Sequence, residues 1–209
     1  MQTAMMRFAQ RGKKEDVLER GIRDKLGSKS IVLVGMPGCG KSAIGRRLAP
    51  RLGLPFVDAD EEIETAAGKS IKEIFADHGE AYFRDGERKV IARLLASGPQ
   101  VLATGGGAMM HEETRANIRG TGISVWVKAD LPVLVRRVLK RSNRPLFEGR
   151  DAETVMKELM DERYPVFATA DIVVESRDVP HDMIVGEIID VLAASPLLSS
   201  VPGPARATP

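Results

Sequence analysis

Residues 35–42 read GMPGCGKS and match the pattern G-x-x-x-x-G-K-[ST] of a phosphate-binding loop. A short β-branched run precedes this segment and a stretch with helical spacing follows it, which is the context that the motif requires. The glycines let backbone N–H groups turn towards phosphate oxygens, and the N-terminus of the following helix adds its positive dipole end. Lys41 can reach the β and γ phosphates, and Ser42 can offer a hydroxyl to Mg²⁺. The motif therefore predicts a site for a nucleoside triphosphate with magnesium.

Cys39 lies inside this loop. Its simplest interpretation is a small residue without a chemical role, and the alternative is a thiol that its neighbours make oxidisable. The loop alone is also compatible with a motor or a GTPase switch. We find no base-reading motif of a GTPase, and extra helical material follows the second predicted strand. The sequence therefore favours a small-molecule kinase.

Two carboxylates, Asp58 and Asp60, follow the second predicted strand. Residues two apart on extended chain point to the same face, and open α/β sheets bind ligands outside the carboxyl ends of their strands. One carboxylate can hold a magnesium-bound water beside Ser42. The other can accept a hydrogen bond, and a proton, from a substrate hydroxyl. Alternatively, both side chains only cap the next helix.

A run of glycines, Gly105 to Gly107, ends the third predicted strand, although the phosphate loop lies elsewhere. Ordered glycine costs backbone entropy, so the run requires a reason. A tight strand-to-helix turn would account for one or two of these residues. Alternatively, bare N–H groups at Gly106 and Gly107 can approach a carboxylate or a hydroxyl closely and form a second backbone platform.

Arg84 and Glu87 stand three residues apart on a predicted helix, so Glu87 can brace the guanidinium. Such pairs are usually solvated surface pairs that stabilise little. Here the neighbouring Phe83, Val90 and Ile91 indicate a helix that packs. Arg84 can therefore point into a cleft.

The polar segment KRSNRPLFEGRDAE carries Arg141 and Arg144 between two predicted helices. A loop bearing arginines is typical of a lid that closes over phosphates and excludes water, with a surface linker as the alternative. Arg163 stands at the end of a predicted helix broken by Pro165, where an arginine is usually a partner of the helix dipole.

These residues need a scaffold, and the chain predicts one by alternating short apolar runs with helical stretches. Helices are expected near 42–52, from 59 to about 96, at 129–141 with Asp130 as cap, and at 180–194. Such an alternation predicts a buried parallel sheet covered on both faces, that is, a three-layer α/β/α fold. The five predicted strands are SIVLVG (30–35), PFVD (55–58), QVLATGGG (100–107), GISVWVKAD (122–130) and DIVVES (171–176).

Composition excludes several other classes of protein. The 209 residues suit one domain, and no apolar run approaches the roughly 20 residues that span a bilayer. One cysteine excludes an internal disulfide framework, and three scattered histidines lack metal-ligand spacing. The start of the chain lacks the pattern of a secretory signal or transit peptide, so a cytoplasmic location is expected. The net charge is +2, and residues 1–29 hold eight Lys/Arg against four Asp/Glu, so no nucleic-acid-binding face is predicted on the body.

The two ends differ from the body. Residues 1–29 form an N-terminal extension, in which Val17, Leu18, Ile22 and Leu26 predict a short amphipathic helix interrupted by Gly21. This helix can pack on the body or on a second subunit, or it can fray. Residues 196–209 are rich in Pro and Ser and are expected to be a disordered tail. Between them, residues 30–195 form one domain, with a helical insert at about 59–97 and the lid at about 141–151.

The order of these segments resembles the shikimate kinase family over about residues 30–195. The run FVDADEEIETAAGKSIKEIFADHGEAYFRDGE carries the family's Asp-x-Asp-x-x-Ile-Glu pattern, its Gly79-Glu80 pair, and Phe83-Arg84-x-x-Glu87. TGGGA, RPLF and RYPVFATAD then follow in the family's order. Each motif alone is weak, whereas five in register are specific. The segment SRDVP (176–180) stands where the family's adenine loop is expected, but its residues cannot be matched one by one.

The resemblance implies a nucleoside-monophosphate-kinase-like fold whose five-stranded parallel sheet has the order 2-3-1-4-5. It implies transfer of a phosphoryl group from ATP to the 3-hydroxyl of shikimate, a step of chorismate and aromatic amino-acid biosynthesis. It assigns residues as follows: shikimate to Asp60, Arg84, Gly106, Gly107 and Arg163; ATP to Gly38, Cys39, Gly40, Lys41, Ser42, Ala43, Arg137 and Arg144; Mg²⁺ to Ser42 and, through water, Asp58; and catalysis to Lys41, Asp60 and Arg144.

Other readings differ from this one at identifiable residues. A gluconate-type or nucleotide kinase of the same fold would lack the run of glycines and the pair Arg84 and Arg163. A silent nucleotide-binding module would not need Lys41, Asp60 and Arg144 together. Shikimate and ATP are thus the expected partners, without nucleic acid or membrane. We expect a monomer, with a dimer through the N-terminal extension as the alternative.

Overall fold

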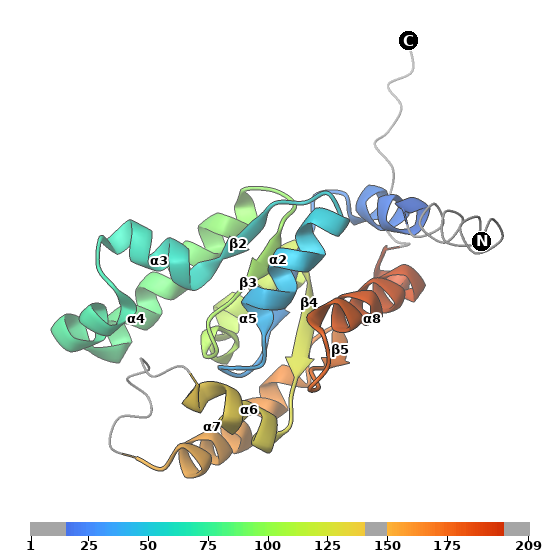
Figure 1. Cartoon of the computed structure of the whole chain (residues 1–209). Helices are drawn as coiled ribbons and strands as arrows, with labels where there is room; N and C mark the ends of the chain where they lie inside the picture. The colour runs from blue at the N-terminus through green and yellow to red at the C-terminus, as the bar shows by residue number, and fades with distance from the viewer. Residues whose placement is uncertain (1–15, 141–149, 199–209) are drawn as a thin grey trace.

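The computed structural model of the chain describes residues 16–140 and 150–198. Its centre is a sheet of five parallel strands in the order β2-β3-β1-β4-β5 (Figure 1). This order confirms the predicted fold. The strands are β1 (Ser30–Val34), β2 (Phe56–Asp58), β3 (Val101–Ala103), β4 (Gly122–Lys128) and β5 (Ile172–Glu175).

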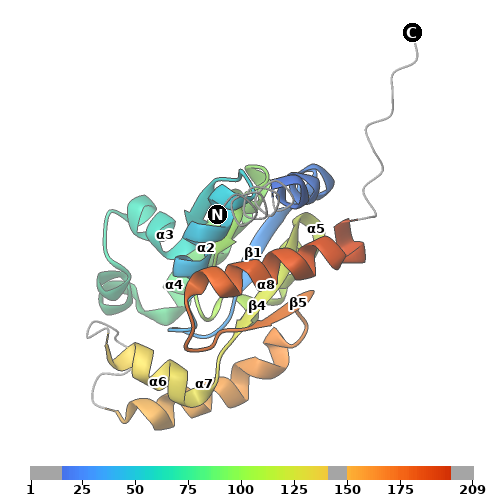
Figure 2. The same ribbon diagram turned by 45° about the vertical axis from the view of Figure 1, so that its right-hand side comes forward.

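Helices cover both faces of the sheet, as predicted (Figure 1, Figure 2). α2 and α8 pack side by side, and α4 packs against α5. The chain crosses the sheet in opposite directions after β1 and after β3, so right-handed crossovers put α2 and α5 on opposite faces. The helices are α2 (Lys41–Arg51), α3 (Ala59–Ala67), α4 (Ile71–Ala96), α5 (Glu112–Thr121), α6 (Leu131–Leu139), α7 (Ala152–Phe167) and α8 (His181–Ala194), with 3-10 turns η1 (Ala108–Met110) and η3 (Pro196–Leu198).

The three central strands are buried between the helical layers, whereas the edge strands β2 and β5 are only partly buried. All residues of β1 and β3 are buried, as are the first six residues of β4. Ile44 and Leu48 of α2 enter the same core from one face, and Ile118 of α5 is buried in it as well. The helical insert has a small core of its own, formed by Ile63, Ile74 and Phe83. The insert is therefore stabilised by a hydrophobic cluster that is separate from the main core.

The register of the central strands brings the predicted site segments to one edge. Leu33 of β1 and Asp58 of β2 both pair with Ala103 of β3. The three strands therefore end level with one another. The phosphate loop, the carboxylates after β2 and the glycines after β3 all emerge at this edge.

Residues 16–26 form a helix that packs on the body. Ile22 and Leu26 are buried in the main core, and Arg51 Nε at the end of α2 donates to Glu19 Oε1 at 2.7 Å. The predicted interruption at Gly21 is wrong, because the helix runs through it. A side chain at Gly21 would meet nothing within 4 Å, so the glycine costs only helix propensity, about 1 kcal/mol.

Two further expectations need correction. α7 is not broken by Pro165 but continues to Phe167; the carbonyl that loses its helical N–H partner belongs to Asp161, an exposed residue. The start of the predicted disordered tail is ordered, because Pro196–Leu198 form η3 and Leu198 is buried. Residues 199–209 lie outside the described residues. Within the described ranges, no helix combines the length and apolar character that a membrane span requires.

Candidate functional site

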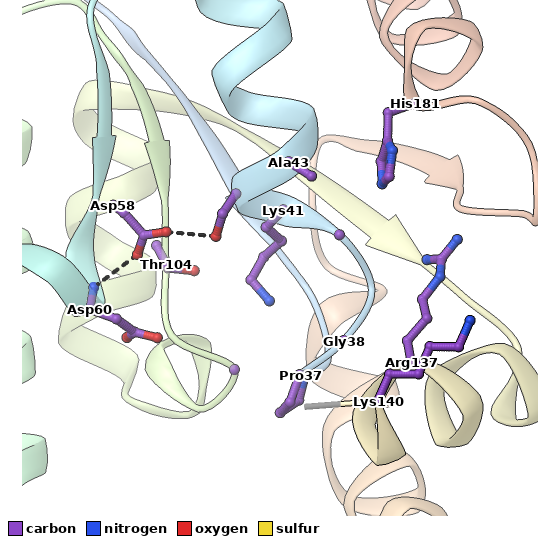
Figure 3. Close-up of a pocket in the computed structure, with 13 residues that line it drawn as sticks. Pro37, Gly38, Lys41, Ala43, Asp58, Asp60, Thr104, Arg137, Lys140 and His181 are labelled. Carbon is purple, nitrogen blue, oxygen red and sulfur yellow. Dashed lines mark hydrogen bonds between the residues drawn. The ribbon is translucent and has the colours of Figure 1, made fainter. Parts of the chain in front are cut away.

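A cavity of about 320 Å³ opens at the carboxyl ends of the central strands (Figure 3). Most of its wall consists of residues predicted to bind ATP, magnesium or the acceptor. The lining residues are Pro37, Gly38, Gly40, Lys41, Ser42, Ala43, Asp58, Asp60, Thr104, Gly106, Arg137, Lys140 and His181.

The phosphate loop joins β1 to α2, as the motif predicts. Gly38 and Gly40 have φ of +87° and +105°, which side-chain-bearing residues rarely adopt. Lys41 Nζ donates to the carbonyls of Gly35 at 2.8 Å and Met36 at 3.1 Å. The ammonium is therefore held inside the loop, at the wall of the cavity.

The side chain of Cys39 does not line the cavity. It is fully buried in the main core, with Sγ 3.7 Å from Lys41 Nζ. The Cys39 carbonyl accepts a hydrogen bond from Arg137. Any contact between Cys39 and a nucleotide would therefore involve its backbone.

Asp58 combines the two roles that the sequence left open. Its Oδ1 accepts from the backbone N–H of Asp60 at 3.1 Å and caps α3. Its Oδ2 accepts from Ser42 Oγ at 2.6 Å, across the cavity wall. Asp60, the second residue of α3, lines the cavity. A carboxylate and a hydroxyl in contact beside a phosphate loop are oxygen ligands of the type that Mg²⁺ prefers.

Arg84 and Glu87 form a buried pair rather than a surface pair. Arg84 NH1 donates to Glu87 Oε2 at 2.6 Å, and the Glu87 side chain is 1% exposed. Burial raises the pKa of Glu87 above its usual value, although Arg84 and Arg163 oppose the shift. Burial acts to lower the pKa of Arg84, but the negative charges of Glu87 and Glu80 outweigh this effect. The pKa of Arg84 is therefore raised above its usual value. Arg84 is thus a fixed, fully charged group.

Arg163 reaches the same region from α7. Its NH1 donates to the carbonyl of Gly106 at 3.0 Å, and the residue is 6% exposed. Burial lowers its pKa, and the nearby charge of Arg84 lowers it as well. Its Nε is buried without a hydrogen-bond partner in the described part of the chain. Arg163 therefore contacts the run of glycines beside the cavity, although it is not itself one of the lining residues, and it does not act simply as a partner of the helix dipole.

The run of glycines is required for space rather than for a turn. None of Gly105, Gly106 and Gly107 has positive φ. A Cβ on Gly105 would collide with Glu87 Oε1, one on Gly106 would lie 2.7 Å from Pro37 Cδ, and one on Gly107 would lie 2.7 Å from the Arg84 guanidinium. The strand-to-helix turn alone therefore does not explain the run. Because these glycines have no side chains, Glu87, Arg84 and Pro37 of the phosphate loop can pack directly against the backbone.

Arg137 is held between the phosphate loop and the segment after β5. Its NH1 donates to the Cys39 carbonyl at 3.3 Å and to Ser176 Oγ at 2.8 Å, and its NH2 donates to the Arg177 carbonyl at 2.8 Å. The segment 176–180, which could not be aligned, thus begins at the cavity.

Sequence reasoning missed three lining residues, namely Thr104, Lys140 and His181. Thr104 begins the TGGGA motif and Lys140 follows α6, but the sequence assigned neither of them to the site. His181 opens α8, close after β5. The rule that ligands bind beyond carboxyl ends of strands could have drawn attention to Thr104 and His181.

Two predicted residues lie outside the described residues. These are Arg141 and Arg144 of the predicted lid, most of which falls in residues 141–149. At its far end, Asp151 Oδ2 accepts from the backbone N–H of Thr154 at 2.8 Å and caps α7.

Comparisons with known proteins agree with this arrangement. The family model of shikimate kinase matches residues 37–193. The chain is 60% identical to a shikimate kinase of Bradyrhizobium diazoefficiens, over 84% of this chain and 85% of that protein. It is 55% identical to a shikimate kinase of Rhodopseudomonas palustris, over 82% of this chain and 86% of that protein.

A solved structure gives the same result. Shikimate kinase from Acinetobacter baumannii, in complex with shikimate, superposes with a TM-score of 0.77 at 32% identity. The match covers 80% of this chain and 94% of that one. The chain therefore belongs to the shikimate kinase family.

Proposed function

We propose that the chain transfers the γ-phosphoryl group of ATP to the 3-hydroxyl of shikimate, giving shikimate 3-phosphate and ADP for chorismate and aromatic amino-acid biosynthesis. One observation carries this proposal beyond membership of the family. The buried Arg163 donates to the carbonyl of Gly106, and the largely buried Arg84 lies against Gly107, next to a cavity lined by a phosphate loop. Glu87 compensates the charge of Arg84, whereas the Nε of Arg163 is buried without a partner in the described part of the chain and favours an anionic ligand.

On the donor side, the backbone of residues 35–43 and the Lys41 ammonium would hold the triphosphate. Arg137 would lie against the adenine, since three acceptors fix its guanidinium at the cavity wall. Ser42 and, through water, Asp58 would hold Mg²⁺, which would neutralise charge on the phosphates. The described residues include no cluster of three His, Cys, Asp or Glu that could bind a metal alone, which suits an ion held partly by substrate phosphates.

On the acceptor side, Arg84 and Arg163 would bind the carboxylate of shikimate by charge-assisted hydrogen bonds. The N–H groups of Gly106 and Gly107 would contact the same ligand. Asp60, which lines the cavity shared with Lys41, would accept a hydrogen bond from a hydroxyl of the ring. The acceptor would thus be oriented with its hydroxyls towards the phosphate loop.

Phosphoryl transfer then depends mainly on position and on neutralised charge. Asp60 would accept the proton of the attacking hydroxyl. Lys41 would stabilise charge on the transferring group, together with Arg144, for which the support is the family resemblance alone.

The same proposal includes a monomeric enzyme in the cytoplasm, where ATP is available, without nucleic-acid or membrane partners. Ile22 and Leu26 of the N-terminal helix are already buried against the chain's own core. This face is therefore not free to bind a second copy.

A coupled assay of ADP release tests the proposal. The purified chain is supplied with ATP and Mg²⁺, and with shikimate, gluconate or a nucleoside monophosphate as acceptor. We expect ADP release with shikimate only, and its loss when EDTA removes the metal. Release with gluconate or a nucleotide, but not with shikimate, would replace the proposal by another kinase activity.

A further inference from the structure

The proposed function gives no role to His181, although this residue forms part of the cavity wall. His181, the first residue of α8, lines the cavity together with Arg137 and the phosphate loop (Figure 3). Its Nε2 lies 3.5 Å from the position that a Cβ on Gly40 would occupy. The imidazole therefore lies directly against the backbone of the phosphate loop.

His181 lies on the side of the loop where the nucleoside end of ATP belongs. Figure 3 shows Asp58 and Asp60 on one side of Lys41, and His181 and Arg137 on the other. The γ-phosphate must point towards the acceptor, and hence towards Asp60, because transfer is in line. The α-phosphate and the ribose then point towards His181.

Besides His181, the lining residues with side-chain donors on this side of the cavity are Arg137 and Lys140 (Figure 3). Ala43, in the first turn of α2, lines it but has only a backbone N–H to offer. Three acceptors already engage the Arg137 guanidinium. An imidazole carries one N–H donor when neutral and two when protonated.

We propose that His181 contacts the nucleotide, donating a hydrogen bond to the phosphate chain at its nucleoside end. This inference rests on the assignment of ATP to this cavity under the proposed function. It adds to that assignment a side chain from the last helix, so that α8 takes part in nucleotide binding.

The charges around His181 give the contact a measurable signature. Burial lowers the pKa of His181, and Arg47 from α2 and Arg137 from α6 lower it further, while Asp182 on α8 opposes them. Lys41 and Lys140 also carry positive charge in this cavity. An added phosphate has the opposite effect and raises the pKa of the imidazole. Nucleotide binding slightly below neutral pH should therefore be accompanied by proton uptake at His181.

The test is calorimetric titration of the full chain with MgADP at a pH of about 6.5, in two buffers of different ionisation enthalpy. The variants are His181→Ala, His181→Gln, which keeps a donor but cannot titrate, and the control Met183→Ala, an exposed residue in the same helical turn. We expect His181→Ala to raise the Kd at least about tenfold and His181→Gln to recover part of that loss. Both should lose the proton uptake that the parent chain and Met183→Ala retain.

An unchanged Kd in His181→Ala, or unchanged proton uptake in His181→Gln, would overturn the inference. If His181→Ala fails to fold, as judged by circular dichroism, His181→Gln still tests the proton uptake. Shikimate is absent throughout, so this failure would leave the proposed activity intact. Conversely, normal MgADP binding without shikimate-dependent ADP release would contradict the proposed function and not the role of His181.

Discussion

Arg84 and Arg163 concentrate positive charge beside Gly106 and Gly107, and their removal should affect the acceptor and not the nucleotide. We predict that Arg84→Ala and Arg163→Ala each lower kcat/KM for shikimate. The loss of transition-state stabilisation should be about 2–5 kcal/mol, the cost of losing one partner of a buried charged contact. This corresponds to roughly 30- to 5,000-fold. The KM for ATP should change little. Steady-state kinetics with each substrate varied in turn would measure both effects.

A control for this prediction is Arg93→Ala, which removes an exposed arginine from the same helix as Arg84. It should leave kcat/KM within about twofold, since exposed pairs stabilise little. Arg84→Lys separates charge from geometry, because an ammonium cannot make the paired contacts of a guanidinium. Shikimate turnover that survives both alanine substitutions would remove these residues from the acceptor site.

Glu87 makes the same site sensitive to acid. Burial raises its pKa, so it takes up a proton at a higher pH than an ordinary glutamate. Below that pH the protonated side chain no longer braces Arg84 as a charged partner, and the KM for shikimate should rise as pH falls. Glu87→Gln should have a high KM at every pH and lose this acidic rise. KM profiles in which the variant follows the parent chain would contradict the assignment.

At the scale of residues, the sequence predicted the groups that have a motif and missed those that do not. The phosphate loop, Asp58 and Asp60 stand where their spacing placed them. The glycines were recognised, but their close contacts with Glu87 and Arg84 were not, because contacts with a distant helix cannot be read from local sequence. His181 was missed for the same reason. Only the packing of α8 on α2 brings it to the cavity.

Among the elements, the N-terminal helix has the clearest testable role. Its buried Ile22 and Leu26 pack beside the end of α2, and Arg23 NH1 would lie 2.7 Å from a Cβ on Gly53. We predict that Ile22→Ala destabilises the fold by roughly 2–5 kcal/mol, as expected for a cavity in a packed core. Urea unfolding would measure the change, with Val17→Ala, which is 71% exposed, as control.

Kinetics of the folded variant would separate stability from catalysis. The helix lies at the end of α2 opposite the phosphate loop, so kcat should be unchanged at temperatures where Ile22→Ala remains folded. Equal stability of Ile22→Ala and the parent chain would mean that the extension merely rests on the body.

Patterns of apolar residues predicted which helices and strands exist, but they predicted less well where a helix is interrupted or kinked. The alternation of strands and helices predicted the parallel sheet, and the strand order came from the family resemblance. Gly21 and Pro165 were read as breaks, yet both lie within helices. Conversely, α4 contains a real kink at Gly79, with φ of 78° and ψ of 176°, in a stretch that reads as continuous. Local propensity is weak against tertiary packing, which decides whether a helix tolerates such residues.

At the scale of the whole molecule, one tyrosine ties the site-bearing edge of the sheet to the helix that carries Arg163. Tyr164 OH donates to the carbonyl of Ala129, at the end of β4, and its ring meets Trp126 edge-on with centroids 4.9 Å apart. Burial raises the pKa of Tyr164 to about 12. The neutral phenol is therefore favoured in the folded chain, and its stabilising effect is complete below the unfolded pKa of about 10 and lost as pH rises towards 12.

We predict that the parent chain loses more stability than Tyr164→Phe when the pH rises from about 9 to 11.5. The two losses in the free energy of unfolding should differ by about 1 kcal/mol. The full pKa shift of Tyr164 would give ~2.7 kcal/mol, but the side chain is only partly buried and solvent screens part of the effect. Urea unfolding followed by the fluorescence of Trp126, the single tryptophan of the chain, would measure it. Lysines titrate in the same range, but they are common to both proteins and cancel in the comparison. Equal losses in the two proteins would show that the Tyr164 phenol does not hold α7 to the sheet, and that the position of Arg163 depends on the packing of Phe167 and its neighbours instead.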